Sequence, residues 1–405
     1  MLRYKLNKIA FWTIILFSIA GIQIALFPGP TTRNIIELIC YVLIGAIFIS
    51  HSNIIFNPNL PYKKLVIAFF IYGIFILIRS ATIAQSYEQW RYLVTLGMFF
   101  ILFPWLIFIG SFPIFTFSIL KTMLSYSLPL SFVFFVLDRM NWSENVHYVK
   151  YTSIIYFLIL FLPYLKSKWK VIIIVISITS LLSNLENRTN IISIFTSYFM
   201  MFFGYLLLKE SISKIIRFVL VFLPILLFLL GISGIFNVFG FIDKKDNYII
   251  STTTTEVNMT SDSRTAIYKD AINNIIEKKN WLIGNGVTDI YKTNLALDLT
   301  GYEKGRMGAS EAGFLNILSF GGIIFTVIIF LLFYLSSYLA IYKSKNSIVK
   351  QLGLYIALQW FLIFIEKPLE LNFYWASMFI IIGICLSPEF RNCSNNQIEK
   401  FLKTL

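Results

Sequence analysis

The chain is a succession of apolar runs that are long enough to cross a membrane as helices. Residues 11–27, FWTIILFSIAGIQIALF, and 323–342, IIFTVIIFLLFYLSSYLAIY, contain no charged side chain. About 20 helical residues cross a hydrocarbon core of about 30 Å. Backbone polar groups must be hydrogen-bonded within the bilayer, and the runs lack the alternation of strands, so the spans are predicted to be helical.

Twelve such spans are predicted, and composition agrees, because 58% of the 405 residues are hydrophobic and only 13% are charged. We therefore expect an all-α integral membrane protein. It divides into a membrane bundle of about nine spans (1–237), a large loop (238–312), and a membrane bundle of about three spans with a tail (313–405). The spans lie at about residues 9–27, 34–50, 65–79, 92–109, 122–137, 150–165, 171–184, 190–208, 218–237, 313–341, 351–365 and 372–387.

The net charge of +14 follows from basic clusters in every second connection. Such clusters mark the cytoplasmic side of a membrane protein, so we expect cytoplasmic termini and a large loop on the outer side. Lys214 and Arg217, which belong to one inner cluster, are expected to meet anionic headgroups. The clusters alternate with apolar runs and form no continuous basic face, so nucleic acid is not an expected partner.

The cysteines and histidines predict neither a disulfide framework nor a metal site. Cys40 and Cys385 fall in spans and Cys393 in the tail, while the two histidines, His51 and His147, lie in separate connections. Disulfide frameworks and zinc sites both need clustered residues at recurring spacings. No cofactor is expected.

The large loop contains one water-soluble segment, SDSRTAIYKDAINNIIEKKNWLIGNG at 261–286. Its apolar residues recur with helical spacing behind a capping Asp262 or Ser263, which predicts an amphipathic helix. The glycines of GNG (284–286) are expected to end that helix. Its apolar stripe needs the bundle mouth or the headgroup layer as a partner, and the polar, Thr-rich stretch before it is expected to be a flexible lead-in.

Two arginines stand where positive charge is costly. Arg188, in SNLENRTN (183–190), follows a short span at a polar break, where it can meet an anionic headgroup, snorkel, or pair with Glu186. Arg264 falls in the first turn of the loop helix, against the helix dipole. A bound anion would explain it, and so would a solvated side chain offset by Asp262.

Glu311, in GASEAGFLNILSFGG, precedes the tenth span at its outer mouth. Desolvation there would raise its pKa towards neutrality and suit a general base, whereas the alternative is an acid that caps a first helical turn. Arg79, Arg91 and Lys367 lie in other outer connections and are candidates to line a vestibule, although topology and solvation also explain them.

These elements together resemble the O-antigen polymerase and O-antigen ligase superfamily of bacterial envelope glycosyltransferases. The resemblance rests on the NR-T element at the central break, the R…Y…A…I pattern of the large loop with its glycine turn, and the FLNIL…GG sequence that enters the tenth span. It covers about residues 180–340 by motif, and the whole chain by the number of spans and the position of the loop.

The resemblance implies a GT-C-like membrane protein of the bacterial inner membrane with a periplasmic loop. It further implies metal-independent glycosyl transfer between two undecaprenyl-diphosphate-linked glycans, donor and acceptor, with Arg188 and Arg264 on the diphosphate. Glu311 occupies the place where the ligases carry a histidine, which favours polymerase over ligase and leaves its own role open. A chain-length regulator and a flippase of the same pathway are the implied partners.

Three alternatives stay open at this stage. A ligase would transfer finished chains to lipid A core, and a flippase or exporter of lipid-linked sugars would also have about twelve spans. A flippase needs no 70-residue charged loop and is expected to show repeat symmetry between its halves. A scaffold for polysaccharide assembly without catalytic activity is the third alternative.

Overall fold

The computed structural model describes residues 2–26, 30–140, 146–183, 187–206, 210–232, 249–252, 255–258, 263–289, 291–292, 306–307, 310 and 312–405. Long helices form its body: α1 (Leu2–Leu26), α2 (Pro30–Ser50), α4 (Lys63–Ile83), α5 (Tyr87–Gly110), α6 (Pro113–Thr122), α7 (Leu128–Met140), α10 (Ser167–Ser183), α11 (Arg188–Leu206), α12 (Glu210–Ile232), α14 (Gly313–Lys343), α15 (Ser347–Ile365) and α16 (Phe373–Leu386).

Shorter elements connect these helices or decorate their ends. A π-helical turn, η1 (Met123–Ser127), joins α6 to α7. The others are α3 (Ser52–Ile55), α8 (Val146–Thr152), α9 (Ile154–Ile159), η2 (Leu162–Tyr164), α13 (Ser263–Glu277), α17 (Pro388–Asn392), α18 (Asn395–Lys403), and two antiparallel strand pairs, β1 (Ile249–Thr252) with β2 (Thr255–Asn258) and β3 (Tyr291–Lys292) with β4 (Arg306–Met307).

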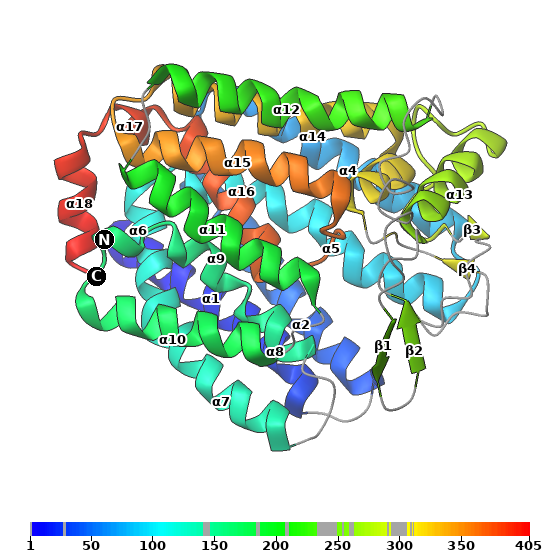
Figure 1. Cartoon of the computed structure of the whole chain (residues 1–405), viewed down its shortest axis with the longest axis horizontal. Helices are drawn as coiled ribbons and strands as arrows, with labels where there is room; N and C mark the ends of the chain where they lie inside the picture. The colour runs from blue at the N-terminus through cyan, green and yellow to red at the C-terminus, as the bar shows by residue number, and fades with distance from the viewer. Residues whose placement is uncertain are drawn as a thin grey trace.

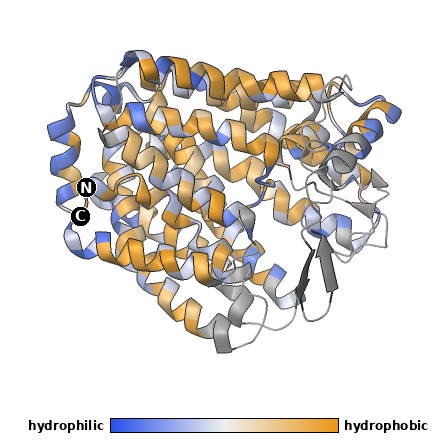
Figure 2. Cartoon of the chain, in the orientation of Figure 1, coloured by the Kyte–Doolittle hydropathy of each residue, from blue (hydrophilic) through white to orange (hydrophobic). Residues whose placement is uncertain are grey.

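The helices lie lengthwise between two different ends of the molecule (Figure 1). Both chain termini, α17 and α18 lie at one end, which we call the basic end because the connections around Lys63, Lys168 and Lys345 are there. At the opposite end, which we call the loop end, lie α13, β1 to β4 and the connection 366–372. Hydrophobic residues cover the helices between the ends (Figure 2).

Each predicted span overlaps helical structure, although residues 150–165 form two short helices, α8 and α9, and a 3-10 turn instead of one helix. Within the described ranges, six helices are long and apolar enough to cross a membrane. The protein is therefore a multi-pass, predominantly helical membrane protein, while the count of twelve spans and the sidedness stay predictions. The six are Lys63–Ile83, Gln89–Gly110, Pro113–Val136, Glu210–Gly231, Gly313–Lys343 and Ser347–Ile365.

One hydrophobic core joins the two predicted membrane segments, and α16 lies within it, with every residue buried. Phe379 of α16 stacks on Phe69 of α4 and on Phe103 of α5, with ring centroids 5.5 and 4.9 Å apart. A Cβ atom at Gly383 would lie 2.1 Å from the Ile107 carbonyl oxygen, so α16 and α5 approach each other backbone to backbone. The described residues up to 232 and those from 313 onwards thus form one packed body.

The tenth span is interrupted, whereas the sequence predicted an unbroken helix over 313–341. Gly322 has φ 66° and ψ −165°, a conformation that a helix cannot contain and that L side chains rarely adopt. The loop segment after α13 hydrogen-bonds to the interrupted backbone: the Asn285 N–H donates to the Ser319 carbonyl (2.6 Å), and the Ile323 N–H to the Trp281 carbonyl (2.9 Å). The hydropathy of the sequence cannot reveal such a break. The break depends on the backbone angle φ of Gly322, and a glycine within an apolar run leaves the run apolar.

The prediction that GNG ends the loop helix is wrong, because α13 already ends at Glu277. Lys279 adopts the left-handed conformation (φ 56°), and the Asn280 N–H donates to the Ile275 carbonyl at 3.3 Å. This is the Schellman arrangement that ordinarily has glycine at that position. Gly284 and Gly286 instead have positive φ where the loop lies against α14 and α4.

The apolar stripe of α13 packs on the mouth of the bundle. Ala271 is buried against Ala312 and Leu315 at the start of α14, with Tyr268 and Ile272 beside them. Of the two surfaces that the sequence allowed, the protein uses the helix bundle. The Thr-rich lead-in also contains the β1–β2 pair, in register from Ile249↔Asn258 to Thr252↔Thr255, as the β propensity of threonine favours.

Arg217 does not meet headgroups as the sequence led us to expect. Its side chain is only 3% exposed and lies over the Tyr334 ring of α14, 4.5 Å from its centroid. The guanidinium donates to the Tyr334 carbonyl (3.0 Å) and to the Ser337 hydroxyl (3.2 Å). A tyrosine-lined face on the neighbouring helix therefore binds this cation within the protein.

Candidate functional site at the α15–α16 connection

The connection between α15 and α16 has a strained backbone at Lys367, which has φ 75°. A residue before proline normally adopts an extended conformation, and Pro368 follows directly. A left-handed backbone at a residue other than glycine costs about 1–3 kcal/mol and persists only where its surroundings impose it. Trp375 is one such restraint, since its indole N–H donates to the Pro368 carbonyl at 2.8 Å.

The Lys367 side chain is buried at this bend and is 4% exposed. Its Nζ donates to the Ser193 hydroxyl and to the Thr189 carbonyl (3.4 Å), and lies 4.5 Å from the centroid of the Tyr374 ring and 5.4 Å from that of Tyr156. Burial lowers the pKa of Lys367 to about 7, although the negative charges of Glu366 and Glu370 oppose the shift. The Lys367 ammonium therefore loses its proton near neutral pH, whereas most lysines stay charged there.

Three other segments of the chain converge on the same short stretch. From α11, the Thr189 hydroxyl donates to the Glu366 carboxylate. From α13, the Tyr268 hydroxyl donates to the Phe364 carbonyl, and at the start of α14 the Gly313 N–H donates to the Glu366 carbonyl at 3.4 Å. Residues 364–367 thus join the central break, the loop helix and the mouth of the tenth span.

These are the segments in which the sequence placed its three principal site residues. Arg188 is the first residue of α11, directly before Thr189, and Arg264 is the second residue of α13, one turn before Tyr268. Glu311 lies outside the described residues, and so do the side chains of the two arginines. The structure therefore brings the three segments together, while the predicted diphosphate clamp and the role of Glu311 stay predictions.

The residues that flank Glu311 are held by Asn316, the asparagine of the FLNIL motif. Its side-chain oxygen accepts from the Ser310 N–H (2.6 Å), and its Nδ2 donates to the Ser310 carbonyl (2.8 Å). The Ala312 N–H donates in turn to the Ser310 hydroxyl at 3.2 Å. Asn316 is buried, so its amide fixes the chain just before α14. An asparagine inside an apolar run was the sequence signal for this role.

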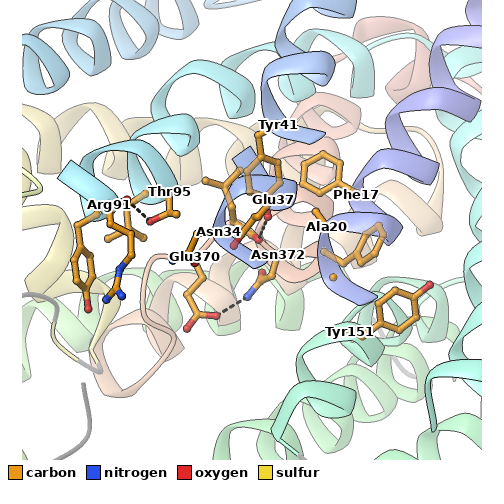
Figure 3. Close-up of a pocket in the computed structure, with 15 residues that line it drawn as sticks. Phe17, Ala20, Asn34, Glu37, Tyr41, Arg91, Thr95, Tyr151, Glu370 and Asn372 are labelled. Carbon is orange, nitrogen blue, oxygen red and sulfur yellow. Dashed lines mark hydrogen bonds between the residues drawn. The ribbon is translucent and has the colours of Figure 1, made fainter. Parts of the chain in front are cut away.

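A polar cavity of about 320 Å³ lies on the other side of the connection, between α1, α2 and α5. Figure 3 shows Arg91 and Glu370 along one part of it, and Glu37 close to Asn372. The Asn372 amide donates to the Glu370 carboxylate at 3.2 Å, and the Tyr41 hydroxyl donates to the Leu371 carbonyl at 2.8 Å. Its aromatic lining consists of Phe17, Tyr41, Tyr92, Tyr151 and Phe373.

The three predicted vestibule residues occupy different surroundings. Arg91 lines the cavity, with its guanidinium 5.6 Å from the centroid of the Tyr92 ring. Lys367 points between α9, α11 and α16 instead, as its contacts with Tyr156, Ser193 and Tyr374 show. Arg79 is on α4, and its Nη1 is buried without a hydrogen-bond partner in the described part of the chain.

Within the described ranges, no three residues among His, Cys, Asp and Glu lie close enough together to hold a metal ion. No protein family, curated protein or solved structure matches the chain. The candidate site therefore rests on its own geometry: a strained, buried lysine, three converging segments, and an adjacent cavity with charged and aromatic walls.

Proposed function

We propose that the protein is a membrane glycosyltransferase that polymerises undecaprenyl-diphosphate-linked oligosaccharide repeat units into O-antigen or a related surface polysaccharide. The reaction takes place at the loop end, which faces the periplasm of a bacterial inner membrane. The observation that carries the proposal is the convergence of α11, α13 and the start of α14 on residues 364–367. Arg188 belongs to α11 and Arg264 to α13, and Glu311 stands two residues before α14 in the sequence.

Arg188 and Arg264 bind the diphosphate of the donor in this proposal. The bond between the anomeric carbon and the diphosphate breaks as the acceptor hydroxyl attacks that carbon, and the diphosphate leaves with the electron pair. Two preorganised guanidinium groups stabilise the charge that develops on it. Arg188 suits this role because it begins α11, where the helix dipole also favours an anion.

Glu311 is the proposed acceptor of the hydroxyl proton. The buried amide of Asn316 supports this assignment, because it restrains the backbone immediately before Glu311. A general base must be held within hydrogen-bond reach of the proton that it removes. Lys367 is proposed as a positioning residue, since its ammonium hydrogen-bonds the first turn of α11 and not the cavity.

The cavity beside the connection is the proposed acceptor site. Aromatic rings offer flat faces to the C–H groups of a sugar, while Glu37 and Glu370 offer hydrogen-bond acceptors for its hydroxyls. A volume of about 320 Å³ falls within the range of small-molecule sites and suits one or two sugar rings.

The decisive experiment replaces the two arginines separately in cells that lack the native copy of the protein. Arg188→Ala and Arg264→Ala are expected to abolish long polysaccharide chains, read as the ladder of chain lengths on a gel, while the protein still inserts into the membrane. Arg139→Ala, at the penultimate residue of α7, removes the same charge from another helix end and is expected to keep the ladder.

A normal ladder in either of the first two variants would refute the proposal. A reconstituted protein that transfers finished polymer to lipid A core would instead be a ligase. One that moves lipid-linked sugar across the bilayer without lengthening it would be a flippase.

A further inference from the structure

An apolar groove opens at the basic end, between the start of α4 and the later part of α14. Its volume is about 610 Å³, and it is separate from the candidate site at the loop end. It is lined by Leu60, Tyr62, Lys63, Lys64, Leu65, Leu331 and Leu335. Four leucines form its floor and walls, so a polar ligand would gain little there.

The groove continues into exposed apolar surfaces of α4 and α14. On α4 the next exposed side chains are Ile67 and Ile71, and on α14 they are Ile324 and Val327. Both helices are among those long and apolar enough to cross a membrane. A chain that enters the groove from this side must therefore be apolar and flexible, as a lipid acyl chain is.

The positive charge of Lys63 and Lys64 favours an anionic group at the other end of such a ligand. Lys63 and Lys64 are the first two residues of α4, no acidic residue stands in that first turn, and the groove lining contains none. Cations at a helix N-terminus oppose the helix dipole, so the pair favours a bound anion. Lys63 Nζ donates to the Pro58 carbonyl at 2.6 Å, which holds one ammonium in place.

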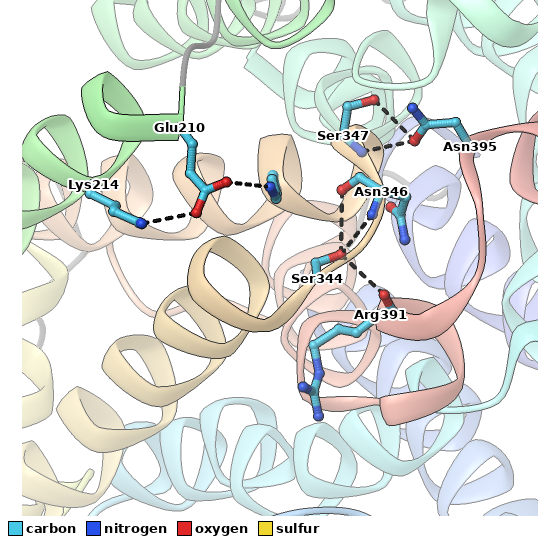
Figure 4. Close-up of polar contacts among 8 residues, drawn as sticks. Glu210, Lys214, Ser344, Asn346, Ser347, Arg391 and Asn395 are labelled. Atoms are coloured by element: carbon cyan, nitrogen blue, oxygen red, sulfur yellow. Dashed lines mark hydrogen bonds and ion pairs between the residues drawn. The ribbon is translucent and has the colours of Figure 1, made fainter.

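A third cation at the same end of the molecule is Arg391, in α17. Arg391 is 9% exposed, and its Nε has no hydrogen-bond partner among the residues described. Burial lowers the pKa of its guanidinium, and the ionisable groups of Cys385 and Tyr62 oppose that shift. Figure 4 shows Arg391 beside the connection between α14 and α15, where the Ser344 hydroxyl donates to its carbonyl at 3.5 Å.

We propose that this groove binds an anionic phospholipid, with an acyl chain on the leucines and the phosphate on Lys63 and Lys64. Surrounding lipid tails are as apolar as leucine, so burial of the chain alone would not distinguish one lipid from another. The two ammonium groups supply the selectivity, because basic side chains at the membrane surface attract anionic headgroups.

The test measures which lipid the purified full-length protein retains. The protein in mild detergent is incubated with equal amounts of dioleoylphosphatidylglycerol and dioleoylphosphatidylcholine, and bound lipid is counted by native mass spectrometry. We expect retention of the phosphatidylglycerol, and a preference reduced roughly tenfold in Lys63→Gln/Lys64→Gln. Lys166→Gln/Lys168→Gln, at α10 of the same end, removes two charges outside the groove and is expected to keep the preference.

A second variant tests the groove without changing charge. Leu335→Trp fills it and is expected to lower the retained phosphatidylglycerol severalfold, with a melting temperature close to that of the native protein. The proposal is overturned if the lysine pair variant keeps the native preference, if the control pair loses it equally, or if folded Leu335→Trp retains as much lipid as the native protein.

Discussion

Two buried polar side chains, Asn346 at the basic end and Lys367 at the loop end, are accommodated in opposite ways. At the basic end, the Asn346 amide donates to the Phe390 carbonyl (2.8 Å) and the Cys393 carbonyl (3.0 Å), and its oxygen accepts from the Val349 N–H (2.8 Å). Figure 4 shows Asn346 beside Ser344, with the ion pair of Glu210 and Lys214 in the same region. At the loop end, Lys367 buries a cation in a left-handed backbone.

The two side chains therefore differ in their effect on stability: the Asn346 amide stabilises the fold, whereas the buried Lys367 lowers its stability. A neutral amide whose hydrogen bonds are all made within the protein adds stability and specifies one geometry. A desolvated lysine in a strained backbone lowers stability, and such costs persist mainly at functional sites. The comparison therefore predicts an anchoring role for Asn346 and agrees with the positioning role proposed for Lys367, and substitutions of either residue can test it.

The largest effect on stability is expected from Asn346→Ala. The change leaves two carbonyls and one N–H without their partner in a buried site, which costs about 3 kcal/mol in the free energy of unfolding. Denaturant unfolding in detergent measures the loss. Asn395→Ala provides the matched control, because that side chain is exposed and accepts only from Ser347; we expect its loss to stay below about 1 kcal/mol. Equal losses in the two variants would contradict an anchoring role for Asn346.

Lys367→Met is expected to keep stability and to lower activity, in contrast to Asn346→Ala. Exchanging a buried cation for an apolar side chain of similar length keeps or raises the melting temperature. The start of α11 loses its restraint, and the proposed polymer synthesis per folded protein is expected to fall roughly 10- to 100-fold, the cost of displacing a binding group by about 1 Å. Both measurements come from one membrane preparation.

Arg217→Met is the control for a buried cation outside the candidate site. It removes two hydrogen bonds and the contact with the Tyr334 ring, so the melting temperature is expected to fall while synthesis per folded protein is kept. If Lys367→Met lowered only stability, or if both variants lost synthesis alike, the two ends would not differ in the way proposed.

Hydrophobic runs predicted the helices well, because most residues of a span must be apolar to be buried in lipid or in the protein core. The sequence also identified the three segments that meet at residues 364–367, since each contains polar residues where an apolar one would be expected. It could not show that these segments meet, because the contact of Thr189 with Glu366 joins residues far apart in the chain and has no local signal.

Backbone conformation was the other property that composition could not supply. The break at Gly322 and the left-handed conformation of Lys279 both depend on the backbone angle φ. A glycine or a lysine within a helical pattern does not show which φ the residue adopts. Lys367 resembled a solvated residue of a turn, and its burial follows from the Tyr156 and Tyr374 rings of α9 and α16. Similarly, Arg217 belonged to a basic cluster by position, and only the packing of α12 on α14 placed it over Tyr334.

The smallest expected effect, taken per unit of pH, is a dependence of stability on pH that Lys367 produces. Its pKa is about 7 in the folded protein against an ordinary value of 10.5, so between these values the unfolded chain binds more protons. The free energy of unfolding therefore rises with pH over this window, on the order of 1.4 kcal/mol per unit, and the contribution is constant outside it. Unfolding at pH 7, 8 and 9 is expected to show this slope in the native protein and not in Lys367→Met. An unchanged slope in the variant would mean that Lys367 keeps an ordinary pKa, and the main distinction between Lys367 and Asn346 would then be lost.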